Sequence, residues 1–103
     1  MTATVAVTQA GGEVVVVAAV AGKKILVRGF ILTGAGTGAV SLINGSAGAS
    51  LSGVLAMVGA SEPNLAPYAP RGWFSTSPGV ALYAVQTGVG SSSQGLVEYI
   101  LAN

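Results

Sequence analysis

Short runs of β-branched and aromatic residues, separated by Gly, Ser, Asn and Pro, recur along the whole chain. Such runs are typical of β-strands, and no long stretch keeps apolar residues at the three-and-four spacing of a helix. The pattern predicts strands over residues 2–8, 13–20, 23–33, 39–43, 50–58, 72–75, 80–87 and 95–101. We therefore expect an all-β protein, an antiparallel β-sandwich that is jelly-roll-like and has about eight short strands.

The length of 103 residues fits a single domain with its own core. We expect the β-sandwich domain to occupy residues 13–103. Residues 1–12 are predicted to form an N-terminal segment, or an arm that reaches a neighbouring subunit. The first strand expected, over residues 2–8, falls inside this segment.

The strand expected over residues 23–33 has two apolar faces. Strict alternation places Ile25, Val27 and Ile31 on one face, which we expect to be the core face. The opposite face then carries Lys24, Leu26, Arg28, Phe30 and Leu32. That face is too apolar for open solvent and yet holds two charges. It fits either a subunit interface with a polar rim or a central strand that is covered on both faces within one chain.

The stretch of residues 59–72 holds three prolines, Pro63, Pro67 and Pro70. Each proline fixes its own φ angle and removes a backbone donor, so this stretch is predicted to be a rigid extended loop and not a strand. Tyr68 and Trp73 lie in or beside it, followed by a phenylalanine. These aromatic side chains form either a contact site for a partner or a plug at one end of the sandwich.

The amino-acid composition limits the kinds of partner that the chain can have. Charged residues make up 7% of the chain, against about 25% in an average soluble domain, so much of the surface is expected to lie against other protein chains. The net charge of +1 gives no footprint for nucleic acid. The mean hydropathy is +0.74, but no window provides the roughly 20 apolar residues of a spanning helix. We expect neither nucleic acid nor membrane as a partner.

No motif for chemistry stands in a suitable context. Residues 34–39 match a dinucleotide-binding glycine pattern, but a helix is not predicted after them, and the next acidic residue is Glu62. The chain has no histidine and no cysteine, so a serine nucleophile would lack its usual base. The three acidic residues, Glu13, Glu62 and Glu98, are far apart in sequence and make no metal-binding loop. We expect a protein that is not an enzyme and has no cofactor, no metal and no catalytic residue.

Two segments carry a family resemblance. The run Ala18-Ala19-Val20-Ala21-Gly22-Lys23-Lys24-Ile25-Leu26-Val27 holds a V-A-G-K-x-I opening, and Leu65-Ala66-Pro67-Tyr68-Ala69-Pro70-Arg71-Gly72-Trp73-Phe74-Ser75-Thr76 with Gly79-Val80-Ala81-Leu82 holds a P-x-G-W-F-x-T-x-x-G-x-A-L signature. Over about residues 18–101 the chain resembles a group of small tailed-bacteriophage virion proteins of the head decoration (cement) type. The chain is poorer in charge and richer in glycine than that group, and residues 1–12 are additional.

The resemblance implies a jelly-roll or related sandwich that assembles as a homotrimer. It further implies binding to the major capsid protein on the outer surface of the capsid, where the trimer would stabilise the shell of the virion. The alternatives are a tail or fibre β-domain that binds a surface glycan or partner protein, and a membrane-inserted chain that uses residues 29–61. The residues expected to contact a partner are Thr2, Thr4, Val5, Tyr68, Arg71 and Trp73.

Overall fold

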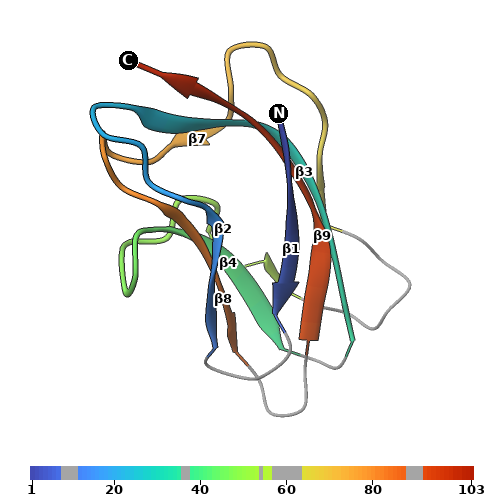
Figure 1. Ribbon diagram of the computed structural model, residues 1–103. Helices are drawn as coiled ribbons and strands as arrows, with labels where there is room; N and C mark the ends of the chain where they lie inside the picture. Colours follow the sequence, from blue (N-terminus) through green and yellow to red (C-terminus); the bar gives the residue numbers. More distant parts are fainter. Residues whose placement is uncertain (8–11, 36–37, 54, 57–63, 88–91) are drawn as a thin grey trace.

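The computed structural model describes residues 1–7, 12–35, 38–53, 55–56, 64–87 and 92–103. Within these residues every regular element is a β-strand, and the strands form two antiparallel sheets packed face to face (Figure 1). The prediction of an all-β antiparallel sandwich is therefore confirmed. The strands are β1 (Thr2–Val7), β2 (Glu13–Val17), β3 (Lys24–Ala35), β4 (Ala39–Asn44), β5 (Leu55–Ala56), β6 (Asn64–Ala66), β7 (Phe74–Ser75), β8 (Leu82–Thr87) and β9 (Ser92–Ala102).

The order of the strands is that of a jelly roll. One sheet runs β1-β9-β3-β6, with β7 also paired to β3, and the other runs β2-β8-β4-β5. β6 and β7 pair with different stretches of β3, so together they take the place of one interrupted strand. If β6 and β7 are counted as one strand, the chain has eight strands in two sheets of four, which is the arrangement of a jelly roll.

The core between the sheets is aliphatic. The strands of both sheets direct alternate side chains into the space between the sheets. Valine, leucine and isoleucine occupy most of these inward positions. The buried cluster consists of Val5, Val7, Val17, Ile25, Val27, Leu32, Val40, Leu42, Leu82, Ala84 and Val97. Full burial of one such side chain stabilises the fold by about 1.5–3 kcal/mol, so this cluster is the main source of stability.

A β-bulge in β3 overturns the predicted core face of this strand. Against β9, Val27 pairs with Tyr99 but Gly29 pairs with Glu98, so Arg28 is an additional residue. An additional residue reverses the alternation beyond it. Ile25 and Val27 are buried as predicted, whereas Ile31 is 40% exposed and Leu32 is buried. The expectation for Ile31 and Leu32 was wrong because strict alternation does not allow for a bulge.

The proline-containing stretch also differs from its prediction. Residues 64–66 form the short strand β6, which pairs with residues 30–32 of β3 at the edge of the sheet. Three residues fit between Pro63 and Pro67, and an edge strand needs backbone hydrogen bonds on one side only. The rest of the described stretch, residues 67–72, is loop as predicted, while residues 59–63 lie outside the described residues.

The N-terminal segment belongs to the sandwich where it is described. β1 pairs with β9 over six residues, from Thr2 opposite Glu98 to Val7 opposite Ser93. Its side chains alternate, and Val5 and Val7 are buried in the core. In this chain β1 is thus an edge strand of the five-stranded sheet. Residues 8–11 lie outside the described residues.

Several other strands are shorter than predicted. β2 ends at Val17, and the backbone then turns, with the Lys23 amide donating to the Val20 carbonyl at 3.0 Å. The strand expected over residues 50–58 is reduced, in its described part, to a bridge between Ser50 and Ile43 and to β5. β7 begins two residues late because Gly72 has a φ of +81°, which belongs to a turn.

Candidate functional site

The outer face of the five-stranded sheet carries a row of four exposed side chains, three of them aliphatic. Leu65 of β6 lies opposite Ile31 of β3, Ile31 lies opposite Leu96 of β9, and Leu96 lies opposite Thr4 of β1. We call these four residues the apolar row. The exposed fractions are 64% for Leu65, 40% for Ile31 and 48% for Leu96. Side by side on neighbouring strands, they form one continuous apolar surface and not scattered single residues.

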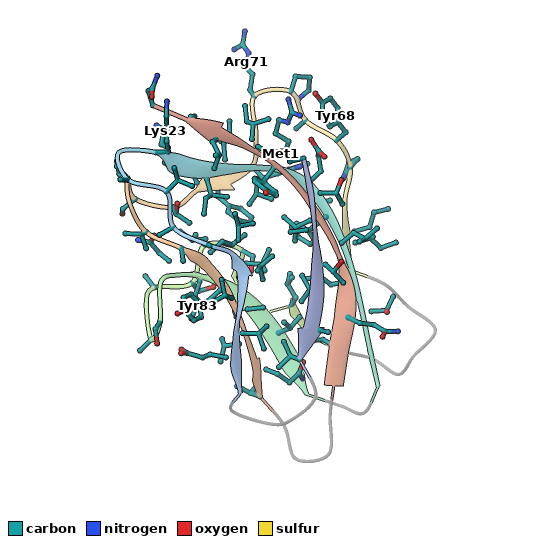
Figure 2. The ribbon with its side chains drawn as sticks, in the orientation of Figure 1. Met1, Lys23, Tyr68, Arg71 and Tyr83 are labelled. Carbon is teal, nitrogen blue, oxygen red and sulfur yellow. The ribbon has the colours of Figure 1, made fainter. Side chains whose placement is uncertain are left out.

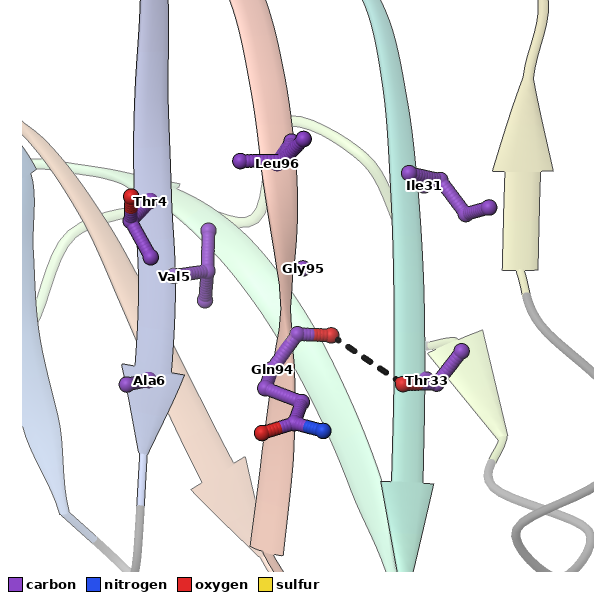
Figure 3. Close-up of a pocket in the computed structure, with 8 residues that line it drawn as sticks. All are labelled: Thr4, Val5, Ala6, Ile31, Thr33, Gln94, Gly95 and Leu96. Atoms are coloured by element: carbon purple, nitrogen blue, oxygen red, sulfur yellow. Dashed lines mark hydrogen bonds between the residues drawn. The ribbon is translucent and has the colours of Figure 1, made fainter.

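Two shallow hollows lie on either side of the centre of this row. Ile31 and Leu96 line both of them. The first, of about 420 Å³, extends over Thr4, Thr33 and Gln94 (Figure 3). The second, of about 330 Å³, extends toward Leu65 and Tyr68. Both are open depressions in a sheet surface, so they suit the side chains of a docked protein.

One ion pair borders the apolar row. The Arg28 Nη2 lies 2.6 Å from Oε1 of Glu98, and the side chains are 19% and 31% exposed. The hydrogen bond from Arg28 holds the pKa of the Glu98 carboxyl below its usual value of 4.5, and the N-terminal ammonium, 3.4 Å away, adds to this effect. The bulge at Arg28 places this side chain on the same face as Glu98. The Glu98 carboxylate is therefore paired with two cationic groups of its own chain.

The loop after β6 adds two exposed aromatic side chains to this end of the sheet. Tyr68 is 59% exposed and Trp73 is 52% exposed. The Arg28 guanidinium lies 5.0 Å from the centre of the Tyr68 ring, and the Trp73 Nε1 donates to the Pro67 carbonyl at 2.9 Å. These contacts fix both rings while leaving much of their surface open. Tyr68 and Trp73 are thus not a buried plug of the sandwich.

The Gly-Trp-Phe element has a structural explanation. Gly72 has a positive φ, and a Cβ at this position would overlap the side chain of Leu26. The Trp73 amide donates to the Val27 carbonyl at 2.7 Å, which begins the pairing of β7 with β3. Phe74 then packs against the core, with its ring 6.4 Å from that of Phe30. The element closes the loop onto β3 and thereby positions Tyr68 and Trp73.

Four of the six expected contact residues are exposed on the five-stranded sheet or on the loop that follows β6. Thr2 and Thr4 lie on the outer face of β1, and Tyr68 and Trp73 lie in the loop that follows β6. Thr2 and Tyr68 line the same hollow (Figure 2 labels Tyr68 next to Met1). Arg71 projects from the tip of that loop, away from the sheet. Val5 points into the core and is fully buried, so its side chain is not offered to a partner.

Sequence reasoning missed the three aliphatic members of the apolar row. Ile31 was expected in the core, and neither Leu65 nor Leu96 was singled out. Leu96 could have been found, because it lies two positions before Glu98 and hence on the same, charged face of its strand. Ile31 and Leu65 carried no such signal, since their position depends on the bulge in β3 and on the pairing of β6.

The outer face of the four-stranded sheet differs from this surface. Ser41 and Ile43 point outward on β4, yet they are only 8% and 4% exposed. Residues 50–52 lie against this strand, where the Leu51 amide donates to the Leu42 carbonyl at 2.8 Å. Residues 50–52 thus extend the edge of this sheet beside β4, where Ser41 and Ile43 are buried, whereas Ile31 and Leu96 on the other sheet stay exposed.

Comparison with known proteins gives no relative. No family model matches the chain, and neither the curated proteins nor the solved structures contain a match. In the part of the chain that the structure describes, no helix is long and apolar enough to cross a membrane. Among those same residues, no group of three or more His, Cys, Asp or Glu side chains is placed to hold a metal ion.

Proposed function

We propose that this chain is a virion structural protein of the head decoration (cement) type, which binds the major-capsid lattice as a homotrimer and stabilises the shell. The observation that carries the proposal is the apolar row, an open aliphatic surface on a chain with very few charges. Uncovered apolar surface of this kind marks a site of protein–protein contact. The jelly-roll order of the strands and the resemblance around Gly72, Trp73 and Phe74 direct the proposal toward a virion.

The mechanism is binding linkage. A protein that binds the assembled shell and not the free capsid subunits stabilises the assembled state by RT ln(1 + [L]/Kd), roughly 2.7 kcal/mol per site at 100 times Kd. No catalytic step is required. The rigid, sparsely charged sandwich provides one or more docking surfaces, and Tyr68 with Trp73 extends the available contact area beyond the sheet. The localisation proposed is the outer surface of the capsid.

Addition of the purified protein to shells that lack it tests this function. Shells incubated with the protein should sediment with it at a fixed ratio and resist heat or a chelator better than untreated shells. A matched control is the protein unfolded by heat before addition. Shells that neither bind the protein nor gain resistance would contradict the proposal.

A tail or fibre role remains a second candidate because Tyr68 and Trp73 are both exposed. A stacked sugar would need a free ring face, and the Arg28 guanidinium already lies over the Tyr68 ring. This candidate would be favoured if the protein binds host cells or their surface glycans, if Trp73→Ala abolishes that binding, and if the protein does not bind capsid shells.

A further inference from the structure

The centre of the apolar row is electrically neutral. None of its four residues is charged, and the nearest charged groups are Arg28, Glu98 and the Met1 ammonium, with Glu98 paired to both cations. The next positions along the same face, on the other side of the row, are Thr33, Gln94 and Ala6, which carry no charge (Figure 3). A partner therefore needs no charged side chain opposite this surface. A charged side chain of the partner would lose its water there without gaining a group of opposite charge.

An uncharged row is well suited to a symmetry axis. In a rotationally symmetric oligomer, a side chain near the axis lies against the same side chain of the other copies. A charge at that place would face its like, whereas an aliphatic side chain packs equally well against its own copy. Ile31 and Leu96 lie at the middle of the apolar row, which crosses four strands, or about 14 Å at the usual strand spacing.

We propose that the outer face of the five-stranded sheet is the interface between copies of this chain, with Ile31 and Leu96 of each copy packed against those of its neighbours around the symmetry axis. The inference rests on the proposed homo-oligomer and assigns it a surface. It leaves the opposite side of the sandwich and the tip of the loop at Arg71 for contact with the capsid lattice.

Cross-linking of single cysteines tests this assignment directly, because the native chain contains no cysteine. Leu96→Cys is the test variant, and Val15→Cys is its control, since Val15 is 51% exposed on an edge strand of the other sheet. Cysteines join only when their Cα atoms lie within about 7 Å, and a short bis-maleimide extends that reach. Leu96→Cys should give a covalent dimer at low protein concentration, and Val15→Cys should stay monomeric. Equal yields, or no product from Leu96→Cys with either treatment, would overturn the assignment.

Mass measurement of charged variants gives a second, independent result. Leu96→Lys should reduce the molar mass in solution to that of a 10.0 kDa monomer, while Val15→Lys should keep the mass of the wild-type oligomer. Circular dichroism checks that both variants are folded. A wild-type oligomer that keeps its mass in Leu96→Lys overturns the assignment of this face, and so does a wild-type protein that is a monomer.

The shell assay separates this inference from the proposed function. A monomeric Leu96→Lys variant that still protects shells would support the interface and contradict the need for a trimer. A wild-type oligomer with the expected cross-links that fails to bind shells would support the interface and contradict the capsid role. Each proposal can therefore fail while the other stands.

Discussion

The substitution Gly95→Ala tests how closely β9 and β3 approach each other. Gly95 lies opposite Leu32 of β3 and Val5 of β1, on the core side of the sheet. A Cβ at this position would overlap the carbonyl oxygen of Ile31 and lie 2.9 Å from its carbonyl carbon and 3.0 Å from the Leu32 Cα. All three atoms belong to the backbone, so no change of rotamer can relieve the overlap. β3 and β9 must move apart.

The expected loss of stability follows from three contributions. Forcing an additional methyl group into a packed site costs about 1–3 kcal/mol. Separation of the strands weakens one or two ladder hydrogen bonds, each worth about 1 kcal/mol. Against this, alanine in a strand is more favourable than glycine by about 0.5–1 kcal/mol, because glycine loses more backbone entropy on folding. We therefore expect the free energy of unfolding to fall by about 2–3 kcal/mol, which lowers Tm by roughly 8–24 °C in a domain of this size.

Thermal and urea unfolding, followed by circular dichroism at one fixed subunit concentration, measures this loss. Gly29→Ala is the matched control, because its Cβ would lie 3.1 Å from the Ala66 oxygen and 3.4 Å from the Tyr68 backbone. β6 is a three-residue edge strand that can shift by a few tenths of an ångström. The control should lose less than about 1 kcal/mol. A Gly95→Ala variant as stable as the wild type would refute the close approach of the two strands.

Two further perturbations probe the core and the ion pair. Leu82→Ala removes a fully buried side chain and should lower the free energy of unfolding by about 2–5 kcal/mol. Its control is Val20→Ala, at a 40% exposed position, which should change this free energy by less than about 0.5 kcal/mol. Equal urea midpoints for the two variants would contradict this account of the core. Because Arg28 lowers the pKa of Glu98 in the folded state, the pair stabilises the fold above pH 4.5, and that stabilisation is lost as the pH falls through the lowered pKa. Glu98→Gln should therefore flatten the acid side of the stability curve relative to the wild type, and an unchanged curve would show that the pair contributes nothing.

The strand predicted over residues 2–8 forms as β1, Thr2–Val7, with Val5 and Val7 pointing inward. The expectation that both Thr4 and Val5 contact a partner did not take this alternation into account. In β3 strict alternation failed beyond Val27, because one additional residue at Arg28 exchanges the two faces. A bulge has no reliable local signature, since it depends on how many residues the neighbouring strand supplies.

The candidate site was predicted only in outline. The proline-containing loop and its aromatic residues stood out as a contact element because of their composition, and the structure places Tyr68 and Trp73 on the surface. The centre of the site was not foreseen. Leu65, Ile31 and Leu96 are far apart in sequence, and only the pairing of β6, β3 and β9 places them side by side.

The sequence by itself determined the all-β class, the positions of most strands and the scarcity of charge, because each of these depends on residue types and their local spacing. Only the tertiary structure decided that β1 completes the sheet, that Arg28 meets Glu98 seventy positions away, and that Leu65, Ile31 and Leu96 lie side by side and exposed on one sheet. The physical reason is that register and bulges are set by hydrogen bonds between strands that are distant in sequence. Whether an apolar side chain faces the core or the surface follows from that register.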